Sequence, residues 1–587
     1  MTVARRPFTR SDTPLIDVLI LGAVGLALLA VTPLWLAAHL AGLGTGRWPH
    51  LGLAQTFSAL LHLRAHLAEP ARAFPPSVRR SLPGPVLFYL CLLVTLAGLA
   101  AAGLVGLHLA CRLVNGRAGY ASGHQVAAHL SLAAVRRRAQ HARPALTDRR
   151  PAGRQVGLFL GRDTRSRHAL YGSTEDSYLY LGPPRAGKGV HLIIPQTLDA
   201  PGAVLVTATR PDTLHHTWKL RQRTGPVAVF DPQQLADGVP RLRWSPLAGC
   251  TDPLVAINRA RALAAGAQLS AGTVTDGDFW RSMTEAVLRC YLHAAALDSR
   301  PVIDLLAWTA RPADPTPLRI LRGHLAAAGG WADELAAQAG ADPRQRDSVW
   351  AGVRRSVDAL ADPRVAEACS PPDGAGFDPA RFLNEHGSLY LLGTTGVQLS
   401  VAPLVTALVE HLLDVARTRA AHAQGGRLAP PLTLLLDEAA NIAPLPSLPN
   451  LLADGGGSGI TTVAVLQSLA QARSRWGEAG ADALWDAATT KVILGGLAHA
   501  DDLARISRLA GEIDEPTRTR TTGPGGPSHS ISDRRVPALP IDTLRCLPPG
   551  QAIVLARHTP PVRARLTPWW NRPDADAIRA ATRSPAA

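Results

Sequence analysis

Lysine is almost absent from this chain of 587 residues. Only Lys188, Lys219 and Lys491 are lysines among 61 basic residues, so arginine carries nearly all of the positive charge. The planar guanidinium of arginine cannot replace a compact ammonium group that fits between phosphates. A lysine kept at one position therefore suggests that the chemistry of that position requires it.

Cysteine is also scarce, and the spacing of the cysteines does not suit folds that depend on zinc or on disulfide bonds. The six cysteines show neither Cys-x-x-Cys pairs nor histidines at metal-ligand spacing. This pattern argues against a zinc site and against a disulfide framework, and it suits a reducing compartment. The cysteines are Cys91, Cys111, Cys250, Cys290, Cys369 and Cys546.

Two stretches lack charge altogether, residues 18–38 and 84–110, and each is long enough to span a bilayer. The first could also be a secretory signal peptide, but its apolar run is longer than usual for one. We predict two transmembrane helices, with a short helix over 54–67 lying on the outer membrane surface. The predicted segments are an N-terminus at 1–14, a first transmembrane helix at 15–43, an external loop at 44–83 and a second transmembrane helix at 84–110.

Residues 178–195, YLYLGPPRAGKGVHLIIP, read as a strand, a glycine-bounded loop and the start of a helix. Backbone N–H groups of such a loop, together with the positive end of the helix, form a cradle for polyphosphate into which a lysine places its charge. The full pattern is G-x-x-x-x-G-K-[ST], and Gly189 stands where the hydroxyl residue would be. The alternative is a glycine-rich turn with a surface lysine. The predicted nucleotide-binding residues are Gly182, Pro183, Pro184, Arg185, Ala186, Gly187, Lys188, Gly189 and Val190.

Two further stretches place polar side chains at strand ends. In LTLLLDEAAN (432–441), an apolar strand ends in Asp437 and Glu438. Open α/β sheets bind ligands at this carboxyl edge. Asp437 would hold Mg²⁺ and Glu438 would orient the attacking water; the alternative is an acidic pair at a helix start. In GITTVAVLQSLAQ (459–471), a strand delivers Gln467 to the same edge, unless Gln467 is an ordinary surface residue.

Alternating strand and helix patterns predict an α/β fold with a parallel sheet, interrupted by a helical stretch. The Gly-, Ser- and Thr-rich residues 521–533 read as a mobile loop, and residues 551–566 read as a hairpin that turns around Pro560 and Pro561. The predicted segments are a basic juxtamembrane segment at 111–155, a nucleotide-binding domain in two parts at 156–255 and 371–570, an all-α domain at 256–370 and a disordered tail at 571–587.

In this order the motifs resemble the type IV secretion system coupling proteins, the TraG/TraD-like conjugative DNA-transfer ATPases. The resemblance covers about residues 180–500, more weakly to 570. Besides the two apolar spans, it rests on GPPRAGKGVHLIIP, VFDPQQL followed by RWSPL, DFW at 278–280, LLLDEAANIAPLPSLPNLL, GITTVAVLQSLAQARSRWG and KVILGG.

The resemblance implies a RecA-like P-loop ATPase domain with an inserted all-α domain and two N-terminal transmembrane helices. It implies a homo-hexamer that uses ATP and Mg²⁺. Lys188 would bind the β- and γ-phosphates, Asp437 the metal and Glu438 the water, and Gln467 would sense the γ-phosphate. The implied partners are DNA, with single-stranded DNA favoured, a relaxase or other secretion substrate, the secretion channel and the membrane. Because ATP is cytoplasmic, the ATPase domain of this multi-pass inner-membrane protein would face the cytoplasm.

Two departures from the family pattern bear on the mechanism. Arg210 and Asp212 occupy the site where many members have D-P-K-G-E, and residues 455–459 are GGGSG where many have an arginine. An arginine that acts on a neighbouring subunit's phosphate would then come from elsewhere, with Arg473, Arg475 and Arg508 as candidates. Two alternative functions stay open: an FtsK-like double-stranded DNA translocase, and a non-hydrolysing receptor on a degenerate nucleotide fold.

Overall fold

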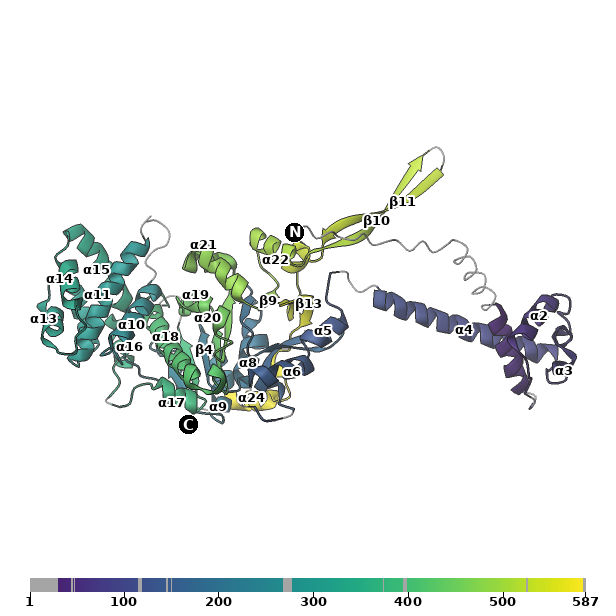
Figure 1. Cartoon of the computed structure of the whole chain (residues 1–587), viewed down its shortest axis with the longest axis horizontal. Helices are drawn as coiled ribbons and strands as arrows, with labels where there is room; N and C mark the ends of the chain where they lie inside the picture. The colour runs from purple at the N-terminus through teal and green to yellow at the C-terminus, as the bar shows by residue number, and fades with distance from the viewer. Residues whose placement is uncertain are drawn as a thin grey trace, which may run out of the picture. The chain divides into compact units, whose positions relative to one another are not determined.

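The chain folds into two compact units, residues 1–116 and 117–587 (Figure 1). The structure is a computed structural model, and it describes residues 30–43, 46, 48–114, 119–143, 146–148, 150–267, 277–372, 374–393, 398–523 and 526–583. Each unit is treated separately below.

The first unit is helical and has its own small core. It contains the helix Ala30–Leu43, α2 (Leu53–Leu63), a 3₁₀ turn (Pro70–Ala73), α3 (Pro76–Arg79) and α4 (Pro85–Val114). Phe74 and Phe88 pack with ring centroids 5.7 Å apart, and the Trp35 indole N–H donates to the Leu51 carbonyl at 2.8 Å. The segment between the two apolar stretches is therefore folded against them.

One helix of the described residues, Pro85–Gly106, is long and apolar enough to cross a membrane, with a mean hydropathy of 2.3. Ala30–Leu43 is apolar but shorter, and residues 15–29 of the first predicted span lie outside the described part of the chain. Two spans are therefore not confirmed. The helix expected over 54–67 is α2, which buries Thr56 and Ala59 against the small core; its position on a membrane surface stays a prediction.

The second unit is built on a mixed sheet of 11 strands in the order β2-β1-β13-β12-β9-β3-β8-β7-β4-β6-β5. From β9 to β5 neighbouring strands run parallel, whereas β12, β13, β1 and β2 pair antiparallel. All residues of β3, β4, β6, β7 and β8 are buried, as expected for a parallel sheet covered on both faces. The strands are β1 (Gly157–Asp163), β2 (Ala169–Ser173), β3 (Tyr178–Leu181), β4 (Val204–Ala208), β5 (Val227–Phe230), β6 (Ser388–Leu392), β7 (Leu432–Leu436), β8 (Ile460–Leu466), β9 (Thr490–Leu494), β12 (Gln551–Ala556) and β13 (Thr559–Arg565).

Alternating side chains of each central strand enter two different cores. Leu179 and Leu181 belong to one core, and Tyr178 and Tyr180 to the other. Helices α18 (Gln398–His422), α19 (Ala439–Ile442), α20 (Leu448–Asp454), α21 (Leu469–Ala487), α22 (Ala500–Leu509) and α23 (Ile541–Arg545) contribute to the first core. Helices α5 (Gly123–His129), α8 (Ile194–Asp199) and α9 (Asp212–Arg221) lie with the second core.

Helices without an intervening strand fill the chain between β5 and β6 in the described residues. Five of them begin at an Asp-Pro pair, in which the carboxylate accepts the backbone N–H two residues on at 2.8–3.0 Å and proline fills the first helical position. The helices are α10 (Pro253–Gly266), α11 (Gly277–Leu297), α12 (Ile303–Ala310), α13 (Pro315–Gly323), α14 (Trp331–Ala339), α15 (Pro343–Val357), α16 (Pro363–Ala368) and α17 (Pro379–Asn384). Helices α11 and α13–α16 gather at one end of the unit, whereas α17 lies nearer to α9 (Figure 1).

Three segments differ from the sequence-based expectation. The basic segment 111–155 folds in part onto the sheet: α5 buries Val126, α6 (Leu132–Ala142) buries Val135, and Leu130 is buried between the two helices. Residues 521–523 and 526–533 belong to β10 (Glu512–Gly523) and β11 (Gly526–Pro537), which pair as a hairpin that projects from the unit (Figure 1). The closing hairpin turns between Ala556 and Thr559, ahead of the two prolines.

The prediction of a disordered tail over 571–587 is wrong for residues 571–583. Helix α24 (Ala575–Arg583) lies beside α9 and buries Ile578 (Figure 1). The Arg572 guanidinium donates to both carboxylate oxygens of Asp199 at 2.8 Å and to Asp574 at 2.8 Å. A bidentate pair between residues so distant in sequence could not be read from the local composition.

We expect Arg572→Ala to release this C-terminal segment, because Asp199 and Asp574 would lose their shared partner at a cost of roughly 3 kcal/mol. The full-length protein should then be cleaved several-fold faster by chymotrypsin near Trp569 and Trp570. Arg354→Ala is the control, since its ion pair with Asp358 is exposed on both sides and lies outside the C-terminal segment, and it should leave the cleavage rate nearly unchanged. Equal rates for both variants and wild type would contradict the docking role of Arg572.

Candidate functional site

The phosphate-loop residues lie at the carboxyl end of β3. The Lys188 side chain is only 8% exposed and its ammonium group donates to the carbonyls of Gly182 at 2.6 Å and Pro183 at 3.2 Å. Burial lowers the pKa of Lys188, and the carboxylates of Asp437 and Glu438 oppose that shift. The lone lysine therefore sits inside the loop, within electrostatic reach of both predicted carboxylates.

The backbone of the loop is shaped for close approach by a ligand. Gly187 has φ 84°, and a Cβ there would lie 2.6 Å from the Nδ1 atom of His191. Arg185 is also left-handed, with φ 65°, and its side chain is exposed. A π-helical turn (Gly189–Ile193) and α8 follow, so the loop ends at a helix N-terminus whose first N–H groups have no helical partner. A Cβ on Gly189 would meet no atom within 4 Å, so packing does not require glycine there.

Asp437 and Glu438 follow β7 directly. The Thr207 hydroxyl of neighbouring β4 donates to the Asp437 carbonyl at 2.7 Å and fixes the strand end. Burial raises the pKa of Asp437 to about 6, with Lys188 lowering it and Glu438 raising it. Glu438 has a left-handed backbone, φ 51° and ψ 45°, which is uncommon for a residue other than glycine and is typical of functional sites.

Gln467 reaches the same point from β8, which lies between β3 and β7 in the sheet. Its amide donates to one carboxylate oxygen of Glu438 at 3.1 Å, and the Asn441 amide donates to the other at 3.3 Å. The structure therefore brings together Lys188, Asp437, Glu438 and Gln467. Asn441 and Thr207 were not among the residues predicted from the sequence, although Asn441 stands three residues after Glu438, the spacing of neighbours on a helix face.

A cavity of about 440 Å³ opens beside the phosphate loop. Pro183 and Pro184 line one side, and Gln467, Ser468 and His499 are among the other lining residues. Its wall is braced by the buried carboxylate of Asp502, which accepts the Leu469 N–H at 3.1 Å and pairs with Arg473 at 3.1 Å. No sequence pattern indicated this cavity.

The candidate arginines have partners on their own chain. Arg473 pairs with Asp502, and Arg475 donates to the Ala440 carbonyl in α19 at 2.9 Å. Burial lowers the pKa of Arg475 to about 10. Arg508 is an exposed residue of α22 and donates to the Ala504 carbonyl at 3.4 Å.

Structure also bears on the two departures from the family pattern. In the glycine turn, a Cβ on Gly456 would lie 2.1 Å from the Glu175 carbonyl, so a side chain is excluded at that position. Arg210 is exposed, and Asp212 is the first residue of α9.

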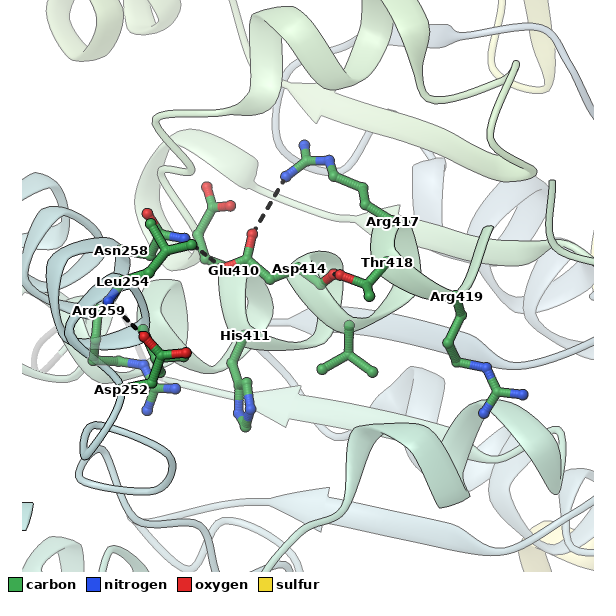
Figure 2. Close-up of a pocket in the computed structure, with 12 residues that line it drawn as sticks. Asp252, Leu254, Asn258, Arg259, Glu410, His411, Asp414, Arg417, Thr418 and Arg419 are labelled. Atoms are coloured by element: carbon green, nitrogen blue, oxygen red, sulfur yellow. Dashed lines mark hydrogen bonds and ion pairs between the residues drawn. The ribbon is translucent and has the colours of Figure 1, made fainter. Parts of the chain in front are cut away.

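A second cavity, of about 480 Å³, lies between α10 and α18 (Figure 2). Glu410 on its wall accepts the Ser447 N–H at 3.2 Å and the Ser447 hydroxyl at 3.0 Å. On the α10 side, Asn258 donates to Asp414 at 3.1 Å. Burial, reinforced by Arg259, lowers the pKa of His411 to about 4, so that ring is neutral. The cavity thus adjoins the chain that follows β7, and its lining does not include the predicted site residues.

Comparison with known proteins gives three kinds of match. Residues 431–549 match the family described as the TraM recognition site of TraD and TraG. The conjugal transfer protein TraG of Rhizobium radiobacter is 28% identical over 179 residues. That match covers 30% of this chain and 27% of the relative, so the aligned part spans about a quarter of TraG.

Solved structures of a bacterial conjugative coupling protein share the fold. The unbound form of TrwBdeltaN70 has a TM-score of 0.54 at 19% identity and covers 78% of this chain and 94% of its own. TrwB in complex with the ATP analogue ADPNP has a TM-score of 0.53 at 19% identity, covering 78% and 95%. TrwB with ADP and Mg²⁺ has a TM-score of 0.52 at 19% identity, covering 75% and 92%.

The structural likeness shows that the second unit, with its mixed α/β sheet, has the fold of the TrwB coupling protein. The family match, over residues 431–549, includes Asp437, Glu438 and Gln467. Together these findings confirm the resemblance that the motifs indicate: this chain is similar to the type IV secretion system coupling proteins, the TraG/TraD-like family.

Proposed function

We propose that this protein is a membrane-anchored, ATP-driven motor that delivers DNA to a type IV secretion channel during conjugation. The single observation that carries the proposal is the meeting of Lys188, Asp437, Glu438 and Gln467 at one edge of the sheet. The similar proteins support a role in conjugation, because their names refer to conjugal transfer or to conjugative coupling.

The phosphate loop fits a nucleoside triphosphate. The space beside Gly189 is open, and the first N–H groups of the following helix face an end of the sheet where ligands bind. The Lys188 ammonium now rests on two carbonyls of its own loop, and phosphate oxygens would replace them as stronger, charged partners. TrwB binds ATP analogues and ADP, and we assign the same class of ligand to this loop.

Mg²⁺ fits the site with Asp437 as its protein ligand. Magnesium keeps several waters and is commonly held by one or two carboxylates and substrate phosphates. No group of three His, Cys, Asp or Glu side chains among the described residues is arranged to hold a metal alone, so phosphate oxygens would complete this site. Magnesium neutralises phosphate charge in such sites. Gly189 contributes no hydroxyl, which leaves more of the coordination to water.

In the mechanism, each residue has a defined task. Lys188 binds the β- and γ-phosphates and balances their charge. Glu438 accepts a hydrogen bond from the attacking water and orients it, with its two oxygens held by Gln467 and Asn441. Since Gln467 contacts Glu438 directly, loss of the γ-phosphate would change the position of both side chains.

The proposal also assigns an oligomeric state, DNA and a membrane anchor to the motor. A homo-hexameric ring would enclose single-stranded DNA linked to a relaxase, and α4 would anchor the ring in the inner membrane. The formal net charge of +16 favours contact with a phosphate backbone. We propose that helices α10–α17 form the inserted all-α domain, a feature that double-stranded DNA translocases usually lack.

We expect Lys188→Ala to reduce MgATP affinity at least ~100-fold, because the phosphates lose a charged hydrogen-bond donor in a buried site. Hydrolysis by the purified full-length protein, and conjugative transfer, should fail together. Lys219→Ala is the control, because its ammonium lies over the Trp218 ring, 5.3 Å from the centroid, and both activities should persist.

Measuring ATP hydrolysis in the presence of DNA separates the alternative functions. Stimulation of wild-type hydrolysis should be stronger with single-stranded than with double-stranded DNA. Stimulation by double-stranded DNA alone would favour the translocase, and nucleotide binding without turnover would favour the receptor. Transfer at wild-type frequency by Lys188→Ala would contradict the motor.

Glu438→Gln should bind MgATP within a few-fold of wild type while turnover falls by about 10²–10⁴, because an amide is a poor acceptor for the water proton. Glu478→Gln provides the matched control, as Glu478 is 82% exposed on α21. Equal turnover of Glu438→Gln and wild type would reject the role of Glu438.

Gln467→Ala and Asn441→Ala should each lower turnover by about 10-fold or more with little change in nucleotide affinity, since each removes one donor that orients Glu438. Single-turnover kinetics and equilibrium binding measure the two effects separately. If both variants lost affinity and kept turnover, these amides would be binding residues and not positioning residues.

A further inference from the structure

Four aromatic rings from distant parts of the chain meet beside the helix that follows the phosphate loop. Trp570 lies 6.4 Å from His191, measured between ring centroids, and 5.7 Å from Trp569. Trp569 in turn lies 4.6 Å from His216 on α9. Trp570 is exposed, whereas Trp569 and the two histidine rings are half-buried.

Trp570 is exposed but held in place. It is 43% exposed. The Arg579 guanidinium donates to its backbone carbonyl at 3.3 Å. Two residues on, the Arg572 fork binds Asp199, the last residue of α8. An exposed ring on a fixed backbone can receive a flat ligand with little loss of entropy.

Trp570 also stands close to the phosphate loop. His191 follows Lys188 by three residues, or roughly 5 Å along a helix, and its ring contacts the Gly187 carbonyl at 2.9 Å. The other side of that ring faces Gly550, where a Cβ would lie 3.5 Å from the Nε2 atom. The His191 ring thus connects the loop with the C-terminal segment that carries Trp570.

The order of the strands separates the two ends of a bound nucleotide. Glu438 and Gln467 approach the loop from β7 and β8, on one side of β3. Gly550 and the segment with Trp570 flank β12 and β13, which lie beyond β9 on the opposite side of β3. With the γ-phosphate at the carboxylates, the nucleoside end points toward His191 and Trp570.

We propose that Trp570, with His191 beside it, forms the stacking surface for the purine base of the nucleotide held by the phosphate loop. This inference rests on the proposed function and adds a specificity-determining residue to it. Aromatic stacking accepts any base, because every base has a π-face. The surface therefore selects nucleotides over bare polyphosphates, and it discriminates little between adenine and guanine.

The test compares the affinity of the full-length protein for MgATP with its affinity for magnesium tripolyphosphate, which has no base. Trp570→Ala should weaken MgATP binding by about 5- to 100-fold and leave tripolyphosphate binding within twofold. Trp570→Phe should restore most of the loss because it keeps an aromatic face. Trp569→Ala is the matched control and should leave the ratio of the two affinities at the wild-type value.

The outcomes distinguish this inference from the proposed function. If wild type binds both ligands and Trp570→Ala binds MgATP as well as wild type does, the stacking surface is refuted and the motor stands. If Trp570→Ala loses both ligands equally, the ring supports the loop and not the base, which also overturns the inference. If wild type binds neither ligand, the proposed function itself falls.

Discussion

A buried ammonium group facing two carboxylates at the edge of a parallel sheet is the constraint on which the rest of this structure depends. Burial lowers the pKa of Lys188 and raises that of Asp437 to about 6, and each charge opposes the shift of the other. Such a group of charges is costly unless its members stay close. The strand order β3-β8-β7 keeps them close, because it aligns three carboxyl ends side by side.

The segment that follows these carboxylates is held from several directions. Arg475 and Trp476 of α21 donate to the carbonyls of Ala440 and Leu445 at 2.9 Å. Glu410 of α18 binds Ser447 through both of its oxygens. Since α18 packs on α10, the first of the helices between β5 and β6, the end of β7 is physically connected to the helical part of the unit. The motor that we propose would need such a connection between hydrolysis and movement.

The C-terminal part of the chain completes the other side of the phosphate loop. β12 and β13 extend the sheet beyond β9, and the Arg572–Asp199 pair draws the last segment back onto α8. This return places Trp570 near His191. The nucleotide-binding region is therefore assembled from both ends of the second unit, around a helical stretch inserted between them.

Local patterns fixed much of the fold. The apolar runs that became β3, β7 and β8 are followed by the phosphate loop, the acidic pair and Gln467, as the sequence predicts. Each Asp-Pro pair between Asp252 and Asp378 marks a helix start, which is a local signal of the sequence. The apolar residues 84–110 became part of α4. These features depend on neighbours within a few residues, so the sequence contains them.

The sequence by itself determined which residues are candidates for the chemistry: the lone loop lysine, the acidic pair and the strand-end glutamine. Only the tertiary structure decided that Asn441 shares Glu438 with Gln467, that residues 571–583 dock as a helix and that Trp570 stands beside the loop. Those contacts join residues up to hundreds of positions apart, as Arg572 and Asp199 do. Their formation depends on the order of strands in the sheet, which periodicity does not encode.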